Sequence, residues 1–145
     1  MRSIVLSLLI ISLTTLAQAN IEATNLVDQI SDNSASEFAE CAAFFTLISR
    51  SLEKTSYAEA SSKYDDLSTQ AAIYSREFSQ SGRDAEMADK VTLARFKFYL
   101  EDMLTEIDYN LSNTSILFSD HLQPCINSME DPIEVFKRWS NKIEN

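Results

Sequence analysis

Residues 57–78, YAEASSKYDDLSTQAAIYSREF, carry the most regular pattern of the chain. Apolar residues recur there at alternating spacings of three and four, at Tyr57, Ala60, Tyr64, Leu67, Ala71, Tyr74 and Phe78. Such a seam over about three heptads predicts a helix that packs along a neighbour at a shallow angle, as in a bundle or a coiled coil. Ser56 and Glu59 have the form of a capping box at its start, and Gly82 favours a helix end just after it.

The sequence before this stretch predicts a first helix that begins at Ser34. Ser34 and Glu37 again have capping-box form. Apolar residues follow at helical spacings, at Phe38, Cys41, Phe45, Ile48 and Leu52. Residues 20–33 are expected to form a short entry helix or a tail.

The sequence after this stretch predicts a long third helix and then a broken segment. Asp84 is the expected N-cap of a helix over residues 85–111, whose apolar positions drift around the helix instead of holding one line. The apolar pattern loosens after residue 110 and resumes over residues 116–126. Pro124 is expected to kink or shorten that segment.

A last helix completes the expected fold. Asp131 is its candidate N-cap and Pro132 its first residue, and the expected inner face is Ile133, Phe136, Trp139 and Ile143. The chain has one glycine and two prolines in 145 residues, and no segment alternates apolar and polar residues as a strand does. We therefore expect an all-α domain over residues 34–145, an up-and-down bundle of about four helices with a broken fourth.

The N-terminus has the pattern of a secretory signal peptide. A positive charge at Arg2 precedes an apolar run over residues 4–16, and the sequence AQA at residues 17–19 forms a small-x-small cleavage site. We expect residues 1–19 to be cleaved and the mature protein to be periplasmic or secreted. The alternative is a retained membrane anchor, although the run is shorter than the ~20 residues that span a bilayer.

Two cysteines, Cys41 and Cys125, lie near the two ends of the mature domain. A lone pair in an oxidising compartment typically forms a disulfide. A redox-active pair is the alternative, but it would more naturally have the C-x-x-C spacing, which is absent. We expect a structural disulfide that ties the fourth element to the first. It would close a loop of about 85 residues, which the chain-entropy model values at roughly 4 to 5 kcal/mol.

The chain is acidic, with 22 acidic and 12 basic residues and a net charge of −10. This sign disfavours binding to nucleic acids and to anionic lipid surfaces, because phosphates attract Lys and Arg. Solubility alone accounts for such a charge, and a basic protein partner also fits it.

Motifs for catalysis, metals and cofactors are missing. His121 is the single histidine, which excludes a three-histidine zinc site, and no Glu-x-x-His motif offers a di-iron centre. Haem ligation by His121 with Met87, Met103 or Met129 is the weaker interpretation, because scattered methionines are typically core residues. A serine triad using His121 would lack the glycines of a nucleophile elbow. We expect no catalytic site, cofactor or metal.

Acidic residues cluster near the end of the predicted third helix, at Glu101, Asp102, Glu106 and Asp108. A solvated helix face is the ordinary interpretation of such a cluster. The functional interpretation is a docking face for a cationic partner, which charge complementarity would steer. Asn110 and Asn113 begin N-glycosylation sequons, which matter only if the source organism uses them.

The sequences CAAFF at residues 41–45, Asp-Pro at 131–132 and Arg-Trp at 138–139, together with Cys125, carry a resemblance. The pattern resembles a group of small exported bacterial helical proteins of unknown function. The match touches both ends of the domain but not its middle. It implies a bacterial periplasmic location and brings no catalytic residues with it.

These observations together predict a protein-interaction domain. Export, small size, negative charge and missing catalytic groups suit an immunity or inhibitor protein that covers a basic partner with an acidic helical face. One alternative is a bundle that binds an apolar or aromatic small molecule between its helices, because aromatic residues are plentiful. Another is a secreted protein with no catalytic activity.

Overall fold

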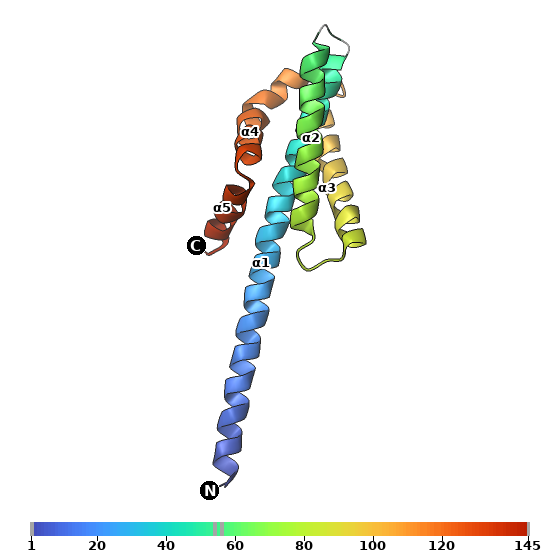
Figure 1. Cartoon of the computed structure of the whole chain (residues 1–145). Helices are drawn as coiled ribbons and strands as arrows, with labels where there is room; N and C mark the ends of the chain where they lie inside the picture. The colour runs from blue at the N-terminus through green and yellow to red at the C-terminus, as the bar shows by residue number, and fades with distance from the viewer. Residues whose placement is uncertain (1, 54, 56, 145) are drawn as a thin grey trace.

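The computed structural model describes the backbone of residues 2–53, 55 and 57–144, and the side chains of residues 22–53, 55, 57 and 59–143. Over this described part the chain forms five α-helices and no strand (Figure 1). The α-helices are α1 (Arg2–Glu53), α2 (Ala58–Ser79), α3 (Ala85–Glu106), α4 (Gln123–Glu130) and α5 (Pro132–Glu144). A 3-10 helix, η1 (Leu111–Leu117), and a π-helix, η2 (Phe118–Leu122), lie between α3 and α4. The predicted all-α class is confirmed.

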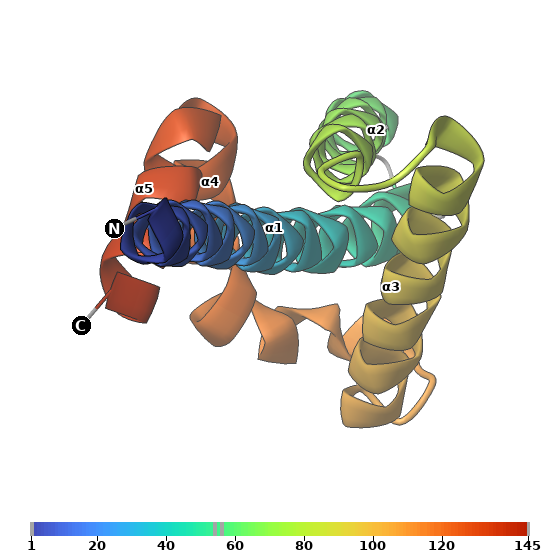
Figure 2. The same cartoon turned by 90° about the horizontal axis from the view of Figure 1, so that it is seen from below.

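The helices form the expected up-and-down arrangement around α1. α2 returns along α1, α3 runs back beside them, and the chain then crosses to the other side of α1 (Figure 1). The view along α1 shows α2 and α3 on one side of it and α4 and α5 on the other (Figure 2). We call η2, α4 and α5 together the C-terminal arm. This arm is the predicted broken fourth element.

The seam between α1 and α2 is lined by small polar residues. Ser61, Ser68 and Ser75 are buried at seven-residue intervals along α2. Their hydroxyls donate hydrogen bonds to backbone carbonyl oxygens of α1, at Ser49 (3.0 Å), Ala42 (2.9 Å) and Ala35 (2.7 Å) respectively. The acceptors are also seven residues apart but in the reverse order, as two antiparallel helices require. We call these three contacts the serine ladder.

The serine ladder widens the predicted inner face of α2. Each of its serines directly follows a predicted seam residue, and the predicted seam residues Tyr64, Leu67 and Ala71 also pack in the core. Tyr57, the first predicted seam residue, is 64% exposed, whereas Ala71 is fully buried. Serine can occupy a buried position because its hydroxyl finds an acceptor, and its small side chain lets the helices approach closely.

The core is built mainly from α1. Phe38, Phe44 and Phe45 are fully buried. The ring of Phe38 lies 5.2 Å from that of Tyr74 and 5.7 Å from that of Phe78, measured between centroids. These contacts follow the side of α1 that faces α2, and they join the serine ladder in holding the two helices together.

Three predicted helix signals are confirmed. The side chain of Asp84 accepts a hydrogen bond from the Met87 amide at 2.8 Å at the start of α3, and Asp131 does the same for Glu134 at 3.0 Å at the start of α5. Gly82 has φ +67° in the turn between α2 and α3, a conformation that glycine adopts easily. Ser56, the predicted cap of α2, lies outside the described residues.

The predicted helix start at Ser34 is wrong, because α1 passes through it without interruption. Ser34 is fully buried, and its hydroxyl donates to the Ile30 carbonyl at 2.9 Å, one turn earlier in the same helix. A mid-helix serine commonly bonds in this way. Residues 20–33 are therefore neither a tail nor a separate short helix but part of α1.

Contacts with the turn between α2 and α3 explain why the helix continues. Ser81 donates to the Asp28 carboxylate at 2.7 Å. Arg83 forms two hydrogen bonds of 2.7 Å with Asp32, and Arg95 adds one of 2.9 Å. Burial alone would raise the pKa of Asp32, but the hydrogen bonds and charges of the two arginines outweigh it and lower the pKa below its usual 3.8.

The second half of the chain departs from its predicted boundaries. α3 ends at Glu106 rather than near residue 111, because Asp108 and Tyr109 turn the chain with φ of 53° and 54°. Pro124 stands in the first turn of α4 instead of kinking a longer helix. On α5 the buried residue is Val135, and Ile133, which was expected to face inward, is 68% exposed.

Candidate functional site

The four acidic residues of the predicted docking face all lie at the surface. Glu101, Asp102 and Glu106 are exposed on α3, and Asp108 is exposed in the turn that follows. Among the described residues, no Lys or Arg forms an ion pair with any of the four. Their charge is therefore directed to solvent.

Two exposed aromatic side chains flank these acids. Phe98, one helical turn before Glu101 and Asp102, is 66% exposed, and Tyr109 is 61% exposed. The Tyr109 hydroxyl donates a hydrogen bond to the Glu101 carboxylate. We call Phe98, Tyr109 and the four acids the acid–aromatic face. Sequence reasoning missed the two aromatics because the drifting apolar pattern of α3 does not separate inner from outer positions.

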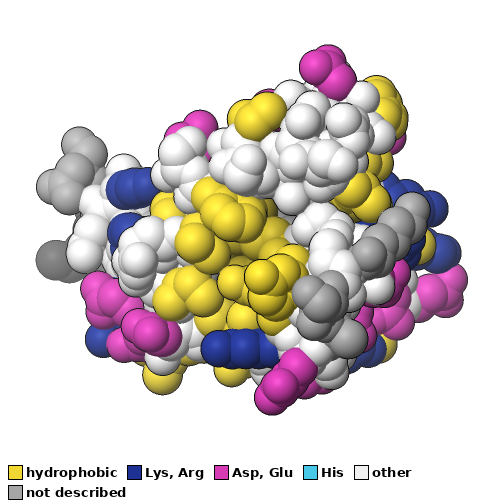
Figure 3. Space-filling model, turned by 90° about the horizontal axis from the view of Figure 1, so that it is seen from above, with side chains coloured by type: hydrophobic (Ala, Val, Ile, Leu, Met, Phe, Trp, Pro, Cys, Tyr) yellow, Lys and Arg dark blue, Asp and Glu magenta, His cyan; other side chains and the backbone are white. Residues whose placement is uncertain are grey.

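The turn that carries Tyr109 is conformationally unusual. Asp108 and Tyr109 are consecutive residues other than glycine with positive φ, a conformation that costs free energy and often marks functional segments. At this end of the bundle, hydrophobic side chains gather in the middle, and both acidic and basic side chains lie around them (Figure 3). Apolar and acidic groups therefore occur together on this end of the molecule.

The predicted disulfide between Cys41 and Cys125 is present in the structure. The two Cα atoms are 5.3 Å apart, within the usual range, and both residues are 2% exposed. The bond joins α1 to α4, as expected.

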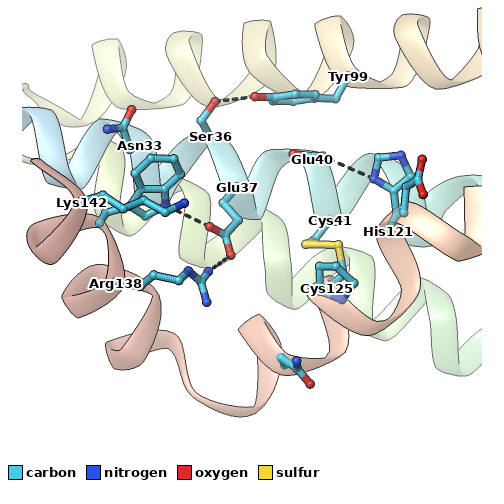
Figure 4. Close-up of a pocket in the computed structure, with 14 residues that line it drawn as sticks. Asn33, Ser36, Glu37, Glu40, Cys41, Tyr99, His121, Cys125, Arg138 and Lys142 are labelled. Carbon is cyan, nitrogen blue, oxygen red and sulfur yellow. Dashed lines mark hydrogen bonds and ion pairs between the residues drawn. A yellow bond between two sulfur atoms is a disulfide. The ribbon is translucent and has the colours of Figure 1, made fainter.

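A cavity of about 620 Å³ opens beside the disulfide, between α1 and the C-terminal arm. We call it the disulfide pocket (Figure 4). Besides the disulfide, its charged and aromatic lining includes Glu37, Glu40, Tyr99, His121, Arg138 and Trp139. Four residues that carry the resemblance noted above thus meet here, namely Cys41, Cys125, Arg138 and Trp139. In the sequence, Glu37 stood out only as the partner of Ser34 in a predicted capping box, and Glu40 gave no signal beyond that of an ordinary helix residue.

Glu37 holds the C-terminal arm at one side of the pocket. One of its carboxylate oxygens accepts hydrogen bonds from Ser128 (2.6 Å) and from the Arg138 guanidinium, and the other accepts from Trp139 Nε1 at 2.9 Å. Its side chain is 19% exposed. A charged carboxylate can stand at such a position because three donors replace its water.

Glu40, one turn along α1, pairs with the only histidine. Glu40 Oε1 lies 3.0 Å from Nδ1 of His121, whose side chain is 15% exposed. The hydrogen bond to Glu40 raises the pKa of His121 above its usual 6.5, against the opposing effect of burial. The charges of Glu106 and Asp120 act in the same direction as that of Glu40. The protonated, cationic form of His121 is thereby favoured.

Two further contacts shape the rim of the pocket. The Lys142 ammonium lies 4.2 Å from the centroid of the Trp139 ring, a cation–π contact. Ser36 and Tyr99 share a hydrogen bond of 2.7 Å between their hydroxyls, which fixes the α3 side of the rim.

The two sequon asparagines both take part in local contacts. Asn110 is exposed, and its side chain accepts from the Ser112 amide at 3.1 Å at the start of η1. Asn113 is half-buried and donates to the Ile107 carbonyl at 3.3 Å. Of the two, Asn110 is the more accessible to a modifying enzyme.

Around Phe44, the aromatic interior considered as an alternative ligand site is filled by the protein's own side chains, whereas a mostly apolar groove of about 470 Å³ lies open between α2 and α3, beside Ile73, Leu93 and Phe96. Phe44 contacts Phe45, Phe118 and His121, with centroids 5.5, 6.2 and 5.6 Å apart. These rings are part of the core that α1 builds. The disulfide pocket, by contrast, is open to solvent and has both polar and apolar walls.

The described residues contain neither a membrane-spanning helix nor a metal-binding group. In the described part of the chain, no helix is both long enough and apolar enough to cross a membrane. The same part of the chain holds no group of three or more His, Cys, Asp or Glu side chains placed to bind a metal ion. The disulfide fits an oxidising compartment.

Compared with protein-family models, curated protein sequences and solved structures, the chain matches none.

Proposed function

We propose that this is an exported protein-interaction domain that binds a basic protein partner through the acid–aromatic face, as an immunity or inhibitor protein does. The observation that carries the proposal is the placement of four exposed acids, free of ion pairs to any described Lys or Arg, around exposed Phe98 and Tyr109. The pattern of a cleavable signal peptide at residues 1–19 and the disulfide support a periplasmic or secreted location.

The two kinds of side chain supply different parts of binding. Unpaired carboxylates steer a cationic surface into contact and favour it over neutral or acidic ones. Aromatic side chains at the centre of an interface contribute most of the affinity once water is excluded. Phe98 and Tyr109 can also contact Lys or Arg of the partner through their ring faces. The net charge of −10 adds long-range attraction.

Charge reversal tests the proposal against a control of equal net charge. The test variant combines Glu101→Lys, Asp102→Lys, Glu106→Lys and Asp108→Lys. The control combines Glu59→Lys, Asp65→Lys, Asp66→Lys and Glu77→Lys, four exposed acids of α2. Native mass spectrometry of the protein purified gently from its own cells measures any stoichiometric protein complex.

We expect the complex to survive in the control and to be lost in the test variant. Phe98→Ala should weaken the complex without changing the net charge, because it removes the aromatic anchor alone. Equal loss in both charge variants would mean that only the overall charge matters. Survival of the complex in the test variant would place the binding surface elsewhere.

A further inference from the structure

The disulfide pocket carries opposite charges at its two ends. Arg138 and Lys142 of α5 lie at one end, and Glu40 and His121 lie at the other (Figure 4). Asp120, which precedes His121 on η2, also lines the pocket, so that Glu40 and Asp120 together outweigh the cationic charge of His121 at this end. The charges of the pocket nearly balance, in contrast to the strong negative charge of the whole chain.

Several of these charged groups have atoms that form no ion pair within the described part of the protein and can therefore contact a ligand. Glu40 uses Oε1 for His121, which leaves its second oxygen available. Asp120 is exposed and forms no ion pair with a Lys or Arg among the described residues. Lys142 rests on the Trp139 ring without an ion pair to a described acid. A cationic group and an anionic group of one ligand can thus be bound together.

The length of the pocket limits the ligand. Asn33 lies beside Lys142 at one end and Glu40 at the other (Figure 4). They are seven residues apart on α1, or about 10 Å at the helical rise of 1.5 Å per residue. An extended chain of three residues has the same length, at about 3.3 Å per residue. A free amino acid is too short to reach both ends.

We propose that the disulfide pocket binds a short peptide with free termini, about three residues long. Its ammonium group pairs with Glu40 and Asp120, and its carboxylate pairs with Lys142. The Asn33 and Asn127 side chains, which also line the pocket, offer hydrogen bonds to peptide groups between the ends. This site is separate from the acid–aromatic face, so it goes beyond the proposed function and does not depend on it.

The first test uses trialanine as the probe and the unmodified protein. Isothermal titration calorimetry at neutral pH should detect binding of trialanine with free termini. N-acetyl-trialanine and trialanine amide each lack one terminal charge and should bind at least about tenfold more weakly, as expected for a lost charge-assisted hydrogen bond. Equal binding of all three peptides, or no binding of trialanine up to millimolar concentration, would overturn the proposal.

The second test assigns the two ends. Glu40→Gln keeps an acceptor for His121 but removes the charge, and Lys142→Gln removes the cation. Each should weaken trialanine binding, whereas Lys97→Gln, an exposed lysine of α3 outside the pocket, should not.

Combining variants with the blocked peptides makes the second test decisive. N-acetyl-trialanine should be insensitive to Glu40→Gln, because its charge partner is already missing, and trialanine amide should be insensitive to Lys142→Gln. The assignment would be overturned if each substitution weakened binding of the blocked peptide as much as binding of trialanine, while circular dichroism showed that the variants are folded. The peptide ends would then not contact these residues.

Discussion

The two sides of α1 are held in different ways. On the α2 side, the serine ladder repeats one contact at every second turn, and aromatic rings pack between its steps. On the other side, the C-terminal arm is held by separate contacts of different kinds, which are the disulfide, Glu37, the Glu40–His121 pair and the ring contacts Phe44–Phe118 and Phe78–Phe136. Removing one contact from a continuous seam should cost little stability, because the neighbouring contacts remain. Removing one of a few separate contacts of the arm should cost more. The arm also leaves the disulfide pocket open between its anchors.

Removing the disulfide should have the largest effect. Cys41→Ser and Cys125→Ser should each lower the free energy of unfolding by about 4 kcal/mol, because the unfolded chain regains the freedom of a long closed loop. The two residues are 84 positions apart. The double variant should be no less stable than either single one, since all three lack the same bond. Urea unfolding measures this, and additive losses would contradict it.

The same cysteine variants test whether the two sides of α1 unfold independently. Amide hydrogen exchange should speed up in α4 and α5 well before it changes in α2, because the serine ladder does not involve the disulfide. Uniform acceleration over the whole chain would mean that both sides unfold as one unit.

Glu37→Gln should have the next largest effect, a loss of about 2 kcal/mol, because the charge that holds three donors is removed. Its donors are Ser128, Arg138 and Trp139. Trp139 is the single tryptophan of the chain, so a red shift of its fluorescence would report that α5 has moved from α1. Glu77→Gln, an exposed acid of α2, is the control and should leave both stability and fluorescence unchanged.

On both sides of α1, the sequence predicted features that depend on local signals better than features that depend on distant residues. Helical periodicity, the caps Asp84 and Asp131, and Gly82 are local signals, and the structure confirms the helices they define. The start at Ser34 was mispredicted because a capping box is also compatible with a helix interior when distant residues support it. That support comes from Arg83 and Ser81, about fifty residues away, and no local pattern reveals it.

The candidate sites were predictable only in part. The pairing of Cys41 with Cys125 followed from there being two cysteines. The exposure of the four acids, three on α3 and Asp108 in the turn after it, agrees with the charge pattern. The disulfide pocket was not predicted, because it is formed by residues of α1, α3, η2, α4 and α5 that tertiary contacts bring together.

Ser75→Ala tests the seam side, where a single change should matter less. Losing the hydrogen bond to the Ala35 carbonyl should cost about 1 kcal/mol, and the higher helix propensity of alanine should offset about half of that. Ser62→Ala changes an exposed position of the same helix. It gains the higher helix propensity of alanine without removing the ladder's hydrogen bond, so it should be slightly stabilising. Thermal unfolding should therefore separate the two variants by about 1 kcal/mol. Equal stability would mean that the ladder contributes packing but no net hydrogen-bond energy.

The smallest expected effect is a pH dependence of the arm. Because the pKa of His121 is raised in the folded state, its pairing with Glu40 stabilises the protein fully below the unfolded pKa of about 6.5 and is lost as the pH rises through the folded value. Glu106 and Asp120 also face His121 and act in the same direction. The wild type should exceed Glu40→Gln in stability by about 0.5 kcal/mol more at about pH 5.5 than at about pH 8.5. Urea midpoints at the two pH values measure the difference, and a gap that is independent of pH would mean that Glu40 holds the arm without the charge of His121.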